Sequence, residues 1–247
     1  MTAPIRAVFF DLDDTLCNYM EVAREARKEV FRNLAAERPE LSADALYRVW
    51  KEEFKRMLPE VRPGGAWRAK YLVSGATTRT EVMRRVLARF GIEDQRLAAR
   101  LSDEYNAGRL ARLRLFPDAE EVLDKLSERF PMGLITNGPA DSQREEIAAL
   151  GIRKWFPHIF IEGEFGVGKP DPAIFHAAAG SVRVRPEELL FVGNALEHDI
   201  RGARRAGLQT CWLTSEEVDP DEADYVADSL TEIAAWIDER TAADCSE

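Results

Sequence analysis

The sequence contains few cysteines and few histidines, the residues that form disulfides and many metal sites. Its 247 residues include only three cysteines, Cys17, Cys211 and Cys245, which are far apart and lack the spacing of metal ligands. So few cysteines exclude a small disulfide-stabilised scaffold and favour a reduced, cytoplasmic setting. The three histidines are equally scattered and form no ligand set.

Long apolar runs are also absent. No stretch approaches the length that a helix needs to cross a bilayer, and residues 1–6 lack the basic start and apolar core of a signal peptide. We therefore expect no membrane partner. The sequence has no internal repeat or low-complexity linker, and its 45% hydrophobic and 32% charged content is typical of a globular protein.

An excess of basic residues is lacking as well. The formal net charge of -10 gives no reason to expect binding to a nucleic acid polymer. The charge is uneven, because residues 17–115 hold 21 Lys+Arg and 14 Asp+Glu, whereas the rest of the chain holds 13 and 30. Such a basic segment could steer small anions toward a cleft between the two parts, although paired, solvated helix faces would give the same counts.

The character of the chain changes twice along its length. Residues 5–10 form a short apolar run that ends at an acidic cluster, which predicts a buried strand. Residues 19–113 are rich in Ala, Arg, Glu and Leu at helical spacing. Breaks near Pro39, at Pro63-Gly64-Gly65 and at Gly91 predict at least four helices there and no strand.

After residue 116 strand-like and helix-like segments alternate. Strands are predicted at residues 132–135, 158–161, 189–192, 210–213 and 224–227. Helices are predicted over residues 118–129 (with Asp118 as N-cap), 142–150 and 200–206, and after the capping box Ser229-Leu230-Thr231-Glu232. This alternation is typical of an α/β fold, a doubly wound parallel sheet with helices on both faces.

The helical block is then an insertion after the first strand. It divides the chain into a core of residues 1–16 and 116–247 and a helical segment of residues 17–115. In doubly wound sheets ligands bind beyond the carboxyl ends of the strands. Those ends are where the most reactive side chains of this sequence lie.

Three carboxylates, Asp11, Asp13 and Asp14, directly follow the first predicted strand. Carboxylates this dense at the end of a buried strand repel one another and lose hydration, which requires a cation or strong donors nearby. Asp11 could attack phosphorus covalently, and Asp13 could act as general acid and base. The alternative is an acidic turn without a chemical role, since aspartate is common in turns.

Polar residues also follow later strands. The hydroxyl and backbone N–H groups of Thr136-Asn137-Gly138 suit phosphate oxygens, although Asn-Gly is first of all a turn signal. Lys169 lies in a rigid loop of glycines and prolines, where its charge could meet a phosphoryl group. Asn194 and Asp199 offer oxygen ligands suited to Mg²⁺, although Asp199 could simply cap the next helix.

In this order and at these strand ends, the four segments resemble the four motifs of the haloacid dehalogenase (HAD) superfamily. The helical block resembles, in length and character, the C1-type cap of its subfamily I. The resemblance extends from Ile5 to about Ile237. It implies a HAD-like Rossmannoid core with an inserted all-helical cap domain. Residues 135–138 and 210–213 are most similar to small-metabolite phosphatases, including pyrimidine-type 5′-nucleotidases and sugar-phosphate phosphatases.

The resemblance also implies a role for each site residue. Asp11 would attack phosphorus and become an aspartyl phosphate, while Asp13 would protonate the leaving oxygen and then activate water. Thr136 and the amide of Asn137 would hold the transferring oxygens, and Lys169 would hold Asp11 and balance charge.

Mg²⁺ is the cofactor that the resemblance implies. Its ligands would be an oxygen of Asp11, the backbone carbonyl of Asp13 and a residue of the fourth motif. That motif usually begins Gly-Asp in the phosphatases, whereas this chain has Gly193-Asn194. An asparagine can coordinate Mg²⁺ through its carbonyl oxygen but brings no charge. We therefore expect either weaker Mg²⁺ binding or a greater contribution of Asp199 to the coordination of the ion.

We therefore predict a Mg²⁺-dependent phosphatase acting on a small phosphorylated metabolite, a nucleoside monophosphate or a sugar phosphate, as a monomer or homodimer. One alternative is a 2-haloacid dehalogenase that uses the same aspartate against carbon without metal; Asn194 favours it and Asp13 opposes it. The other is a non-catalytic descendant that binds a phosphorylated ligand, which only Asn194 favours. The substrate stays open because the core contacts only phosphate.

Overall fold

A computed structural model describes residues 3–244 of the chain, with side chains up to residue 241, so Cys245 lies outside it. The chain divides into two compact units. The sheet unit consists of Met1–Asn18, Arg114–Asn137 and Leu150–Glu247. The helical unit consists of Tyr19–Leu113 and Gly138–Ala149.

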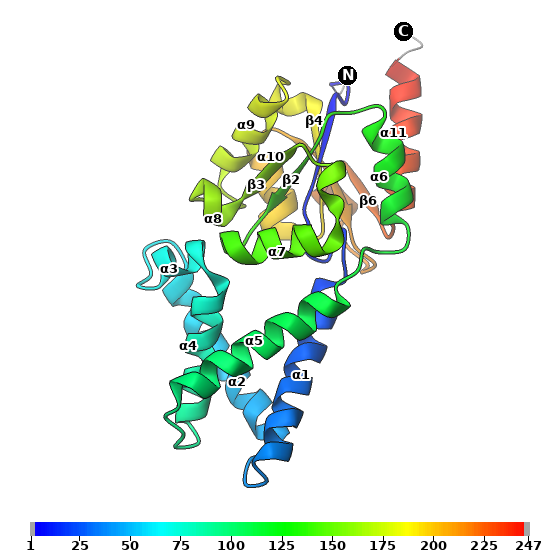
Figure 1. The fold of residues 1–247 in the computed structure, drawn as a ribbon. Helices are drawn as coiled ribbons and strands as arrows, with labels where there is room; N and C mark the ends of the chain where they lie inside the picture. The colour runs from blue at the N-terminus through cyan, green and yellow to red at the C-terminus, as the bar shows by residue number, and fades with distance from the viewer. Residues whose placement is uncertain (1–2, 245–247) are drawn as a thin grey trace. The chain divides into compact units, whose positions relative to one another are not determined.

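Six parallel strands form the sheet of the sheet unit, in the order β3-β2-β1-β4-β5-β6 (Figure 1). Each strand lies within two residues of its predicted position, and the predicted doubly wound fold is confirmed. The strands are β1 (Ala7–Phe10), β2 (Met132–Thr136), β3 (His158–Ile161), β4 (Leu189–Gly193), β5 (Gln209–Leu213) and β6 (Tyr225–Ala227).

Strand β1 lies in the centre of the sheet, and its surroundings explain the apolar run at residues 5–10. All four of its side chains are fully buried, because helices cover both faces of the sheet and both faces of the strand need apolar residues. β1 pairs with β2 on one side and with β4 on the other. The chain order therefore reverses at β1, which makes its carboxyl end the switch point where such sheets bind ligands.

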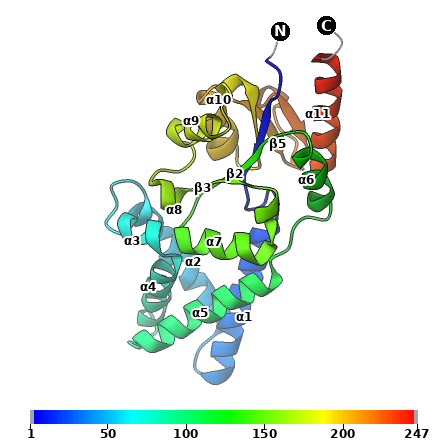
Figure 2. The same cartoon turned by 45° about the horizontal axis from the view of Figure 1, so that its top comes forward.

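Helices cover both faces of this sheet (Figures 1 and 2). α9 (Pro172–Ser181) and α10 (Arg201–Arg205) pack on one face, where Phe175 meets Phe191 of β4 edge-on at a centroid distance of 5.2 Å. α6 (Ala119–Ser127) and α11 (Leu230–Asp244) lie side by side on the other face. Neither α9 nor the short α8 (Glu162–Phe165) is among the predicted helices.

Asp118 occupies the predicted N-cap position of α6 but does not cap that helix through its side chain. Its carboxylate instead accepts a hydrogen bond from the backbone N–H of Thr231, in the first turn of α11, at 3.0 Å. Ser229 caps α11 as predicted, accepting from the N–H of Glu232 at 3.3 Å. The other half of the predicted capping box is shifted by one residue, because the Glu232 carboxylate accepts from the N–H of Asp228 at 3.2 Å. Asp118 therefore joins the starts of two helices that lie far apart in the sequence.

The helical unit contains the predicted helices and, within its described residues, no strand. Ser42, Ser74 and Asp94 each accept a hydrogen bond from a backbone N–H of the helix that follows, and the breaks predicted near proline and glycine separate the elements. None of the described helices is both long and apolar enough to cross a membrane. The elements are α1 (Tyr19–Glu37), α2 (Ala43–Val61), α3 (Arg68–Val73), α4 (Gly75–Ala88), α5 (Gln95–Arg112) and most of α7 (Ala140–Leu150).

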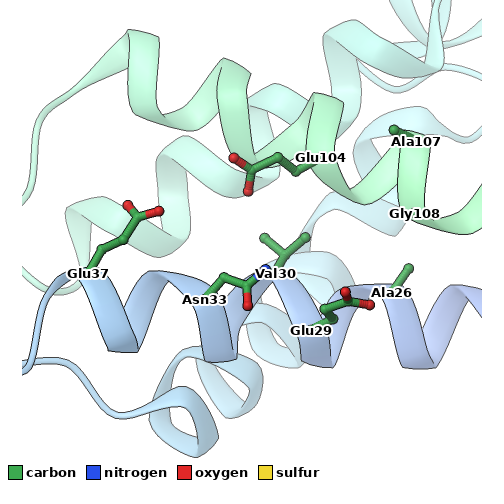
Figure 3. A pocket seen from close by; sticks show the side chains of 8 residues that line it. All are labelled: Ala26, Glu29, Val30, Asn33, Glu37, Glu104, Ala107 and Gly108. Carbon is green, nitrogen blue, oxygen red and sulfur yellow. The ribbon is translucent and has the colours of Figure 1, made fainter.

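A groove of about 310 Å³ lies between α1 and α5 of the helical unit (Figure 3). Its glutamates are paired with arginines, Glu37 with Arg100 and Glu29 with Arg112. Its lining holds none of the predicted site residues, so we do not place the active site there. The lining residues are Ala26, Glu29, Val30, Asn33, Glu37, Glu104, Ala107 and Gly108.

Candidate active site

Asp11 lies at the carboxyl end of β1, at the switch point of the sheet. Its backbone N–H donates to the carbonyl of Val192 in β4 at 2.9 Å, so the ladder of the central strands continues to this residue. The loop then turns back on itself, since the N–H of Leu16 donates to the carbonyl of Leu12 at 2.9 Å. Asp14 adopts a left-handed φ of 60°, which aspartate tolerates better than most residues. Asp11 is thus fixed by backbone geometry and is only 6% exposed.

A buried lysine lies between two carboxylates at this point. The Lys169 Nζ is 2.5 Å from Oδ1 of Asp11 and 2.7 Å from Oδ1 of Asp199. The lysine and both carboxylates are buried. The lysine comes from the loop before α9, and Asp199 from a short π-helix, Leu196–Ile200, that follows β4. The fold therefore brings three segments of the sequence to one charged cluster.

The cluster contains two carboxylates and one lysine, and this imbalance of charge raises the pKa values of both Asp11 and Lys169. Burial raises the pKa of Asp11 to about 6, and the charge of Asp199 adds to the rise, while Lys169 opposes it. Burial alone would lower the pKa of Lys169, but the charges of Asp11 and Asp199 outweigh burial and raise it. Lys169 is therefore a cation, and the site holds more negative than positive charge.

The raised pKa of Asp11 gives a testable titration. In protein freed of metal with EDTA, the Asp11 carboxyl carbon resonance, assigned with Asp11→Asn, is expected to shift at pH about 6. The folded state binds this proton more tightly than the unfolded state. The contribution of Asp11 to stability is therefore present at low pH and is lost as pH rises through about 6. Asp199→Asn should lower the midpoint, because it removes a charge that raises it; an unchanged midpoint would contradict this electrostatic account.

Thr15 and Trp212 position the fourth motif beside Asp11. The Thr15 hydroxyl donates to Oδ2 of Asp11 at 3.0 Å and lies 3.3 Å from Oδ1 of Asn194. The Trp212 indole N–H donates to the backbone carbonyl of Asn194 at 2.9 Å. Neither residue is among the predicted site residues, although Thr15 belongs to the first motif. The oxygen atoms of Asp11 and Asn194 are consequently gathered around one hydroxyl.

Asn137 holds the backbone of Lys169 with its side chain. Its Nδ2 donates to the carbonyl of Lys169 at 2.7 Å, and its Oδ1 accepts from the N–H of the same residue at 2.8 Å. A Cβ on Gly168 would lie 2.5 Å from Oδ1 of Asn137, so this close approach requires glycine. The carboxamide of Asn137 is therefore used to position Lys169, and its backbone N–H is the group that suits a phosphate oxygen.

Asp199 contacts both Lys169 and the backbone of its own loop. Its Oδ2 accepts from the N–H of Ala195 at 2.9 Å, and its Oδ1 pairs with Lys169. A Cβ on Gly193 would lie 2.5 Å from the Asp199 side chain, so a glycine is required opposite it. Asp199 was alternatively expected to cap the helix that begins at Ile200. It does not do so in the usual way, because the N–H from which it accepts belongs to Ala195, the residue before the π-helix.

Five of the seven predicted site residues thus form one group in the sheet unit. Asp11, Lys169, Asn194 and Asp199 are connected by the contacts above, and Asn137 is connected to them through the backbone of Lys169. The remaining two are placed by the strands. Thr136 is the buried last residue of β2, next to β1, and Asp13 lies half-buried two residues after Asp11.

A metal site at this group would have few protein ligands. No set of three or more His, Cys, Asp or Glu side chains suited to a metal ion occurs among the residues that the structure describes. The oxygens of Asp11 and Asn194 around Thr15 nevertheless fit Mg²⁺, which is commonly held by one or two carboxylates while keeping waters and substrate phosphate. The excess negative charge of the cluster also favours a cation there.

Comparison with known proteins identifies the family of this site. A family model described as haloacid dehalogenase-like hydrolase matches residues 5–207. The chain belongs to this family. The predicted superfamily is therefore confirmed, and so is the prediction that this HAD hydrolase is an enzyme.

Relatives of this HAD hydrolase match it over most of its length. It is 33% identical over 231 residues to a glyceraldehyde 3-phosphate phosphatase of Methanopyrus kandleri, with 91% of each chain covered. It is 32% identical over 227 residues to a phosphoserine phosphatase of Thermus thermophilus, covering 85% of this chain and 88% of that one. The magnesium-bound HAD hydrolase YfnB of Bacillus subtilis shares its fold, with a TM-score of 0.72, 21% identity, and 96% and 100% of the two chains covered.

Proposed function

We propose that this HAD hydrolase is a Mg²⁺-dependent phosphatase that cleaves a small phosphate ester through an aspartyl phosphate on Asp11. The observation that carries the proposal is the buried Asp11 carboxylate, held at the switch point by Lys169 at 2.5 Å and Thr15 at 3.0 Å. Relatives that are 32–33% identical over most of the chain are named phosphatases of small metabolites, which supports the same activity here.

In the first step a carboxylate oxygen of Asp11 attacks phosphorus, and the bond from phosphorus to the leaving oxygen breaks. Lys169 neutralises part of the charge of the nucleophile, so that an anionic phosphate ester can approach an anionic side chain. Its position depends on the carboxamide of Asn137 and on Asp199. The hydroxyl of Thr136 and the backbone N–H of Asn137 hold the transferring oxygens.

Asp13 carries the protons in this proposal. As an acid it gives a proton to the leaving oxygen, which departs as an alcohol. As the resulting carboxylate it takes a proton from water, whose oxygen attacks phosphorus and releases Asp11 and inorganic phosphate. Asp13 is half-buried in the loop that follows Asp11, near enough in sequence to share the same phosphoryl group.

Mg²⁺ would be held by a carboxylate oxygen of Asp11, the backbone carbonyl of Asp13 and the side-chain oxygen of Asn194. When bound it supplies positive charge that stabilises the phosphoryl oxygens in the transition state. Hydrolases of this family generally use Mg²⁺. We assign Asp199 to the positioning of Lys169, because its Oδ1 forms an ion pair with Lys169 and its Oδ2 already accepts from the N–H of Ala195.

Asn194→Asp is expected to lower the Mg²⁺ concentration for half-maximal activity by about tenfold, because a second carboxylate binds a hard cation more strongly than an amide. The measurement is a Mg²⁺ activation curve of phosphate release for the wild type and the variant. Asn33→Asp, an exposed change of the same kind on α1, serves as the control. Superimposable curves for wild type and Asn194→Asp would remove Asn194 from the ligand set.

The helical segment, residues 17–115, is proposed to be a cap that selects the leaving group, with residues 1–16 and 116–247 as the catalytic core. The named relatives act on small phosphate esters such as glyceraldehyde 3-phosphate and phosphoserine. The search for the substrate therefore begins with three-carbon phosphate esters and extends to sugar phosphates and nucleoside monophosphates. A monomer or a homodimer remains the predicted state.

The proposal is tested by measuring phosphate release from this panel of esters with Mg²⁺ and with EDTA. Release that requires Mg²⁺ is the expected result. Halide release from 2-haloacids is measured in parallel, because a dehalogenase would release halide in EDTA as well. Halide release without any phosphate release would overturn the proposal in favour of that chemistry.

A further inference from the structure

The peptide group that joins Asn194 to Ala195 is held at both ends by side chains. Its carbonyl oxygen, which belongs to Asn194, accepts from the indole N–H of Trp212 at 2.9 Å. Its N–H, which belongs to Ala195, donates to Oδ2 of Asp199 at 2.9 Å. Because a peptide group is planar, it cannot rotate without breaking one of these two bonds. The backbone beside Asn194 is therefore fixed from two sides, entirely within the sheet unit.

The side chain of Asn194 depends on this backbone for its position. Its Oδ1 lies 3.3 Å from the Thr15 hydroxyl, but that hydroxyl also lies 3.0 Å from Oδ2 of Asp11. A hydroxyl has one hydrogen to donate, and the shorter contact is the one to Asp11. Thr15 therefore holds Oδ1 of Asn194 only weakly and leaves its lone pairs for a cation.

Trp212 is itself held by packing. It is 7% exposed and lies on β5, opposite Gly193 of β4. Its side chain belongs to a hydrophobic cluster that includes Leu196 and Ile200 of the π-helix. The direction of the indole N–H is thus set by the core of the sheet unit. A phenylalanine could fill most of the same space but has no N–H to donate.

We propose that Trp212 is a positioning residue whose indole N–H holds the Asn194–Ala195 peptide in the orientation in which Asn194 binds Mg²⁺. The proposal rests on the function proposed above and adds a residue of β5 to that site. Hydrogen bonds that orient a metal ligand commonly contribute about 10- to 100-fold to metal affinity. Asn194 brings no charge, so its contribution to Mg²⁺ binding depends on where its oxygen points.

Trp212→Phe removes the N–H and keeps most of the ring. The Kd for Mg²⁺, measured without substrate by titration of backbone amide NMR resonances, is expected to rise by about tenfold. kcat for phosphate release at saturating Mg²⁺ should change by less than about threefold. The reason is that Asp199 keeps its bond to the N–H of Ala195 and so still holds Lys169. An unchanged Kd, or a loss confined to kcat, would overturn the proposal.

Trp155→Phe is the matched control. Trp155 is 5% exposed, and its indole N–H donates to Oδ1 of Asp124 at 2.7 Å. It precedes β3, whereas the candidate site lies at the carboxyl ends of the strands. Both variants should lose stability, but only Trp212→Phe should lose Mg²⁺ affinity. An equal rise of the Kd in both variants would mean that the metal site responds to general destabilisation, and it would refute the positioning role.

A double variant tests whether Trp212 acts through Asn194. In an Asn194→Ala background, Trp212→Phe should leave the Kd for Mg²⁺ unchanged within about twofold. A further tenfold rise, by about the same factor as in the wild type, would assign the effect to another group and overturn the proposal. If Trp212→Phe fails to fold, the wild type decides. Mg²⁺ should then shift the indole N–H resonance of Trp212 and not that of Trp155, and an unmoved Trp212 resonance would count against the proposal.

The binding measurement separates this proposal from the phosphatase function. A wild type that binds Mg²⁺ but releases no phosphate would refute the phosphatase function, while a raised Kd in Trp212→Phe would still support the role of Trp212. An active wild type whose Kd is unaltered in Trp212→Phe would refute only the role of Trp212. A wild type that binds no Mg²⁺ would refute both.

Discussion

Asp11→Asn is expected to lower kcat for phosphate release by at least about 10⁴-fold. The amide has nearly the same shape as the carboxylate and keeps hydrogen-bonding partners in Lys169 and Thr15. It lacks the anionic oxygen that attacks phosphorus, so the loss should fall on kcat and not on folding. The measurement is steady-state phosphate release with the best ester of the panel at saturating Mg²⁺.

The control for this variant is Asp14→Asn, three residues further on. Asp14 is a carboxylate of the same loop with a φ of 60°, and asparagine adopts that conformation at least as readily. We expect its kcat to stay within about tenfold of the wild type, because Asp14 has no role in the proposed steps. Similar losses in both variants would mean that the loop tolerates no substitution and that Asp11 has no special part.

Lys169→Met is expected to lower both activity and stability. Removing the cation leaves Asp11 and Asp199 as two buried carboxylates without the lysine that both now face. Breaking a buried ion pair from one side costs about 3–5 kcal/mol in the free energy of unfolding. Loss of one preorganised donor at the reacting group should lower kcat by about 10²- to 10³-fold. Denaturant unfolding and phosphate release measure the two effects separately.

A double variant separates charge balance from catalysis. Lys169→Met combined with Asp199→Asn removes one charge of each sign, so more than half of the lost stability should return while kcat stays low. Lys154→Met is the control, since this lysine is exposed and its nearest carboxylate, Glu120, is 3.6 Å away. Its effect on unfolding should be below about 0.5 kcal/mol. Recovery of activity together with stability in the double variant would contradict the proposed role of Lys169.

The sheet could be predicted from the sequence because its strands are buried on both faces. Continuous apolar runs such as Ala7–Phe10 have no other common explanation when turns and helical segments alternate with them. Helix α9 was detectable in principle, because Asp171 is its N-cap and Pro172 occupies its first turn. The prolines and glycines before it favoured a loop, and that local signal obscured the start of the helix.

Contacts between residues far apart in the sequence could not be predicted from local patterns. The grouping of Gly138–Ala149 with the helical unit depends on pairs such as Arg109 with Glu146, whose partners no local pattern connects. The hydrogen bond that Asp118 provides to α11 spans 113 residues and has the same character. Local patterns specify which elements form, whereas these contacts depend on how the elements pack.

In the candidate site, too, local patterns predicted some features and long-range contacts decided the others. The four motifs predicted which residues gather, because carboxyl ends of parallel strands lie at one edge of the sheet. They did not reveal that Asn137 grips the backbone of Lys169 or that Trp212 holds Asn194. Those are supporting contacts between segments distant in sequence, and a polar side chain can serve many such partners. The catalytic roles of the site residues remain predictions.

The most direct test of the account is to trap the phosphoryl group on Asp11. Asp13→Asn slows hydrolysis of the intermediate, and 4-nitrophenyl phosphate has a leaving group that departs without a proton, so the intermediate still forms. After rapid quenching and borohydride reduction, peptide mass spectrometry is expected to find Asp11 converted to homoserine. Turnover of the ester with an unmodified Asp11, or with the label on another residue, would contradict the central claim.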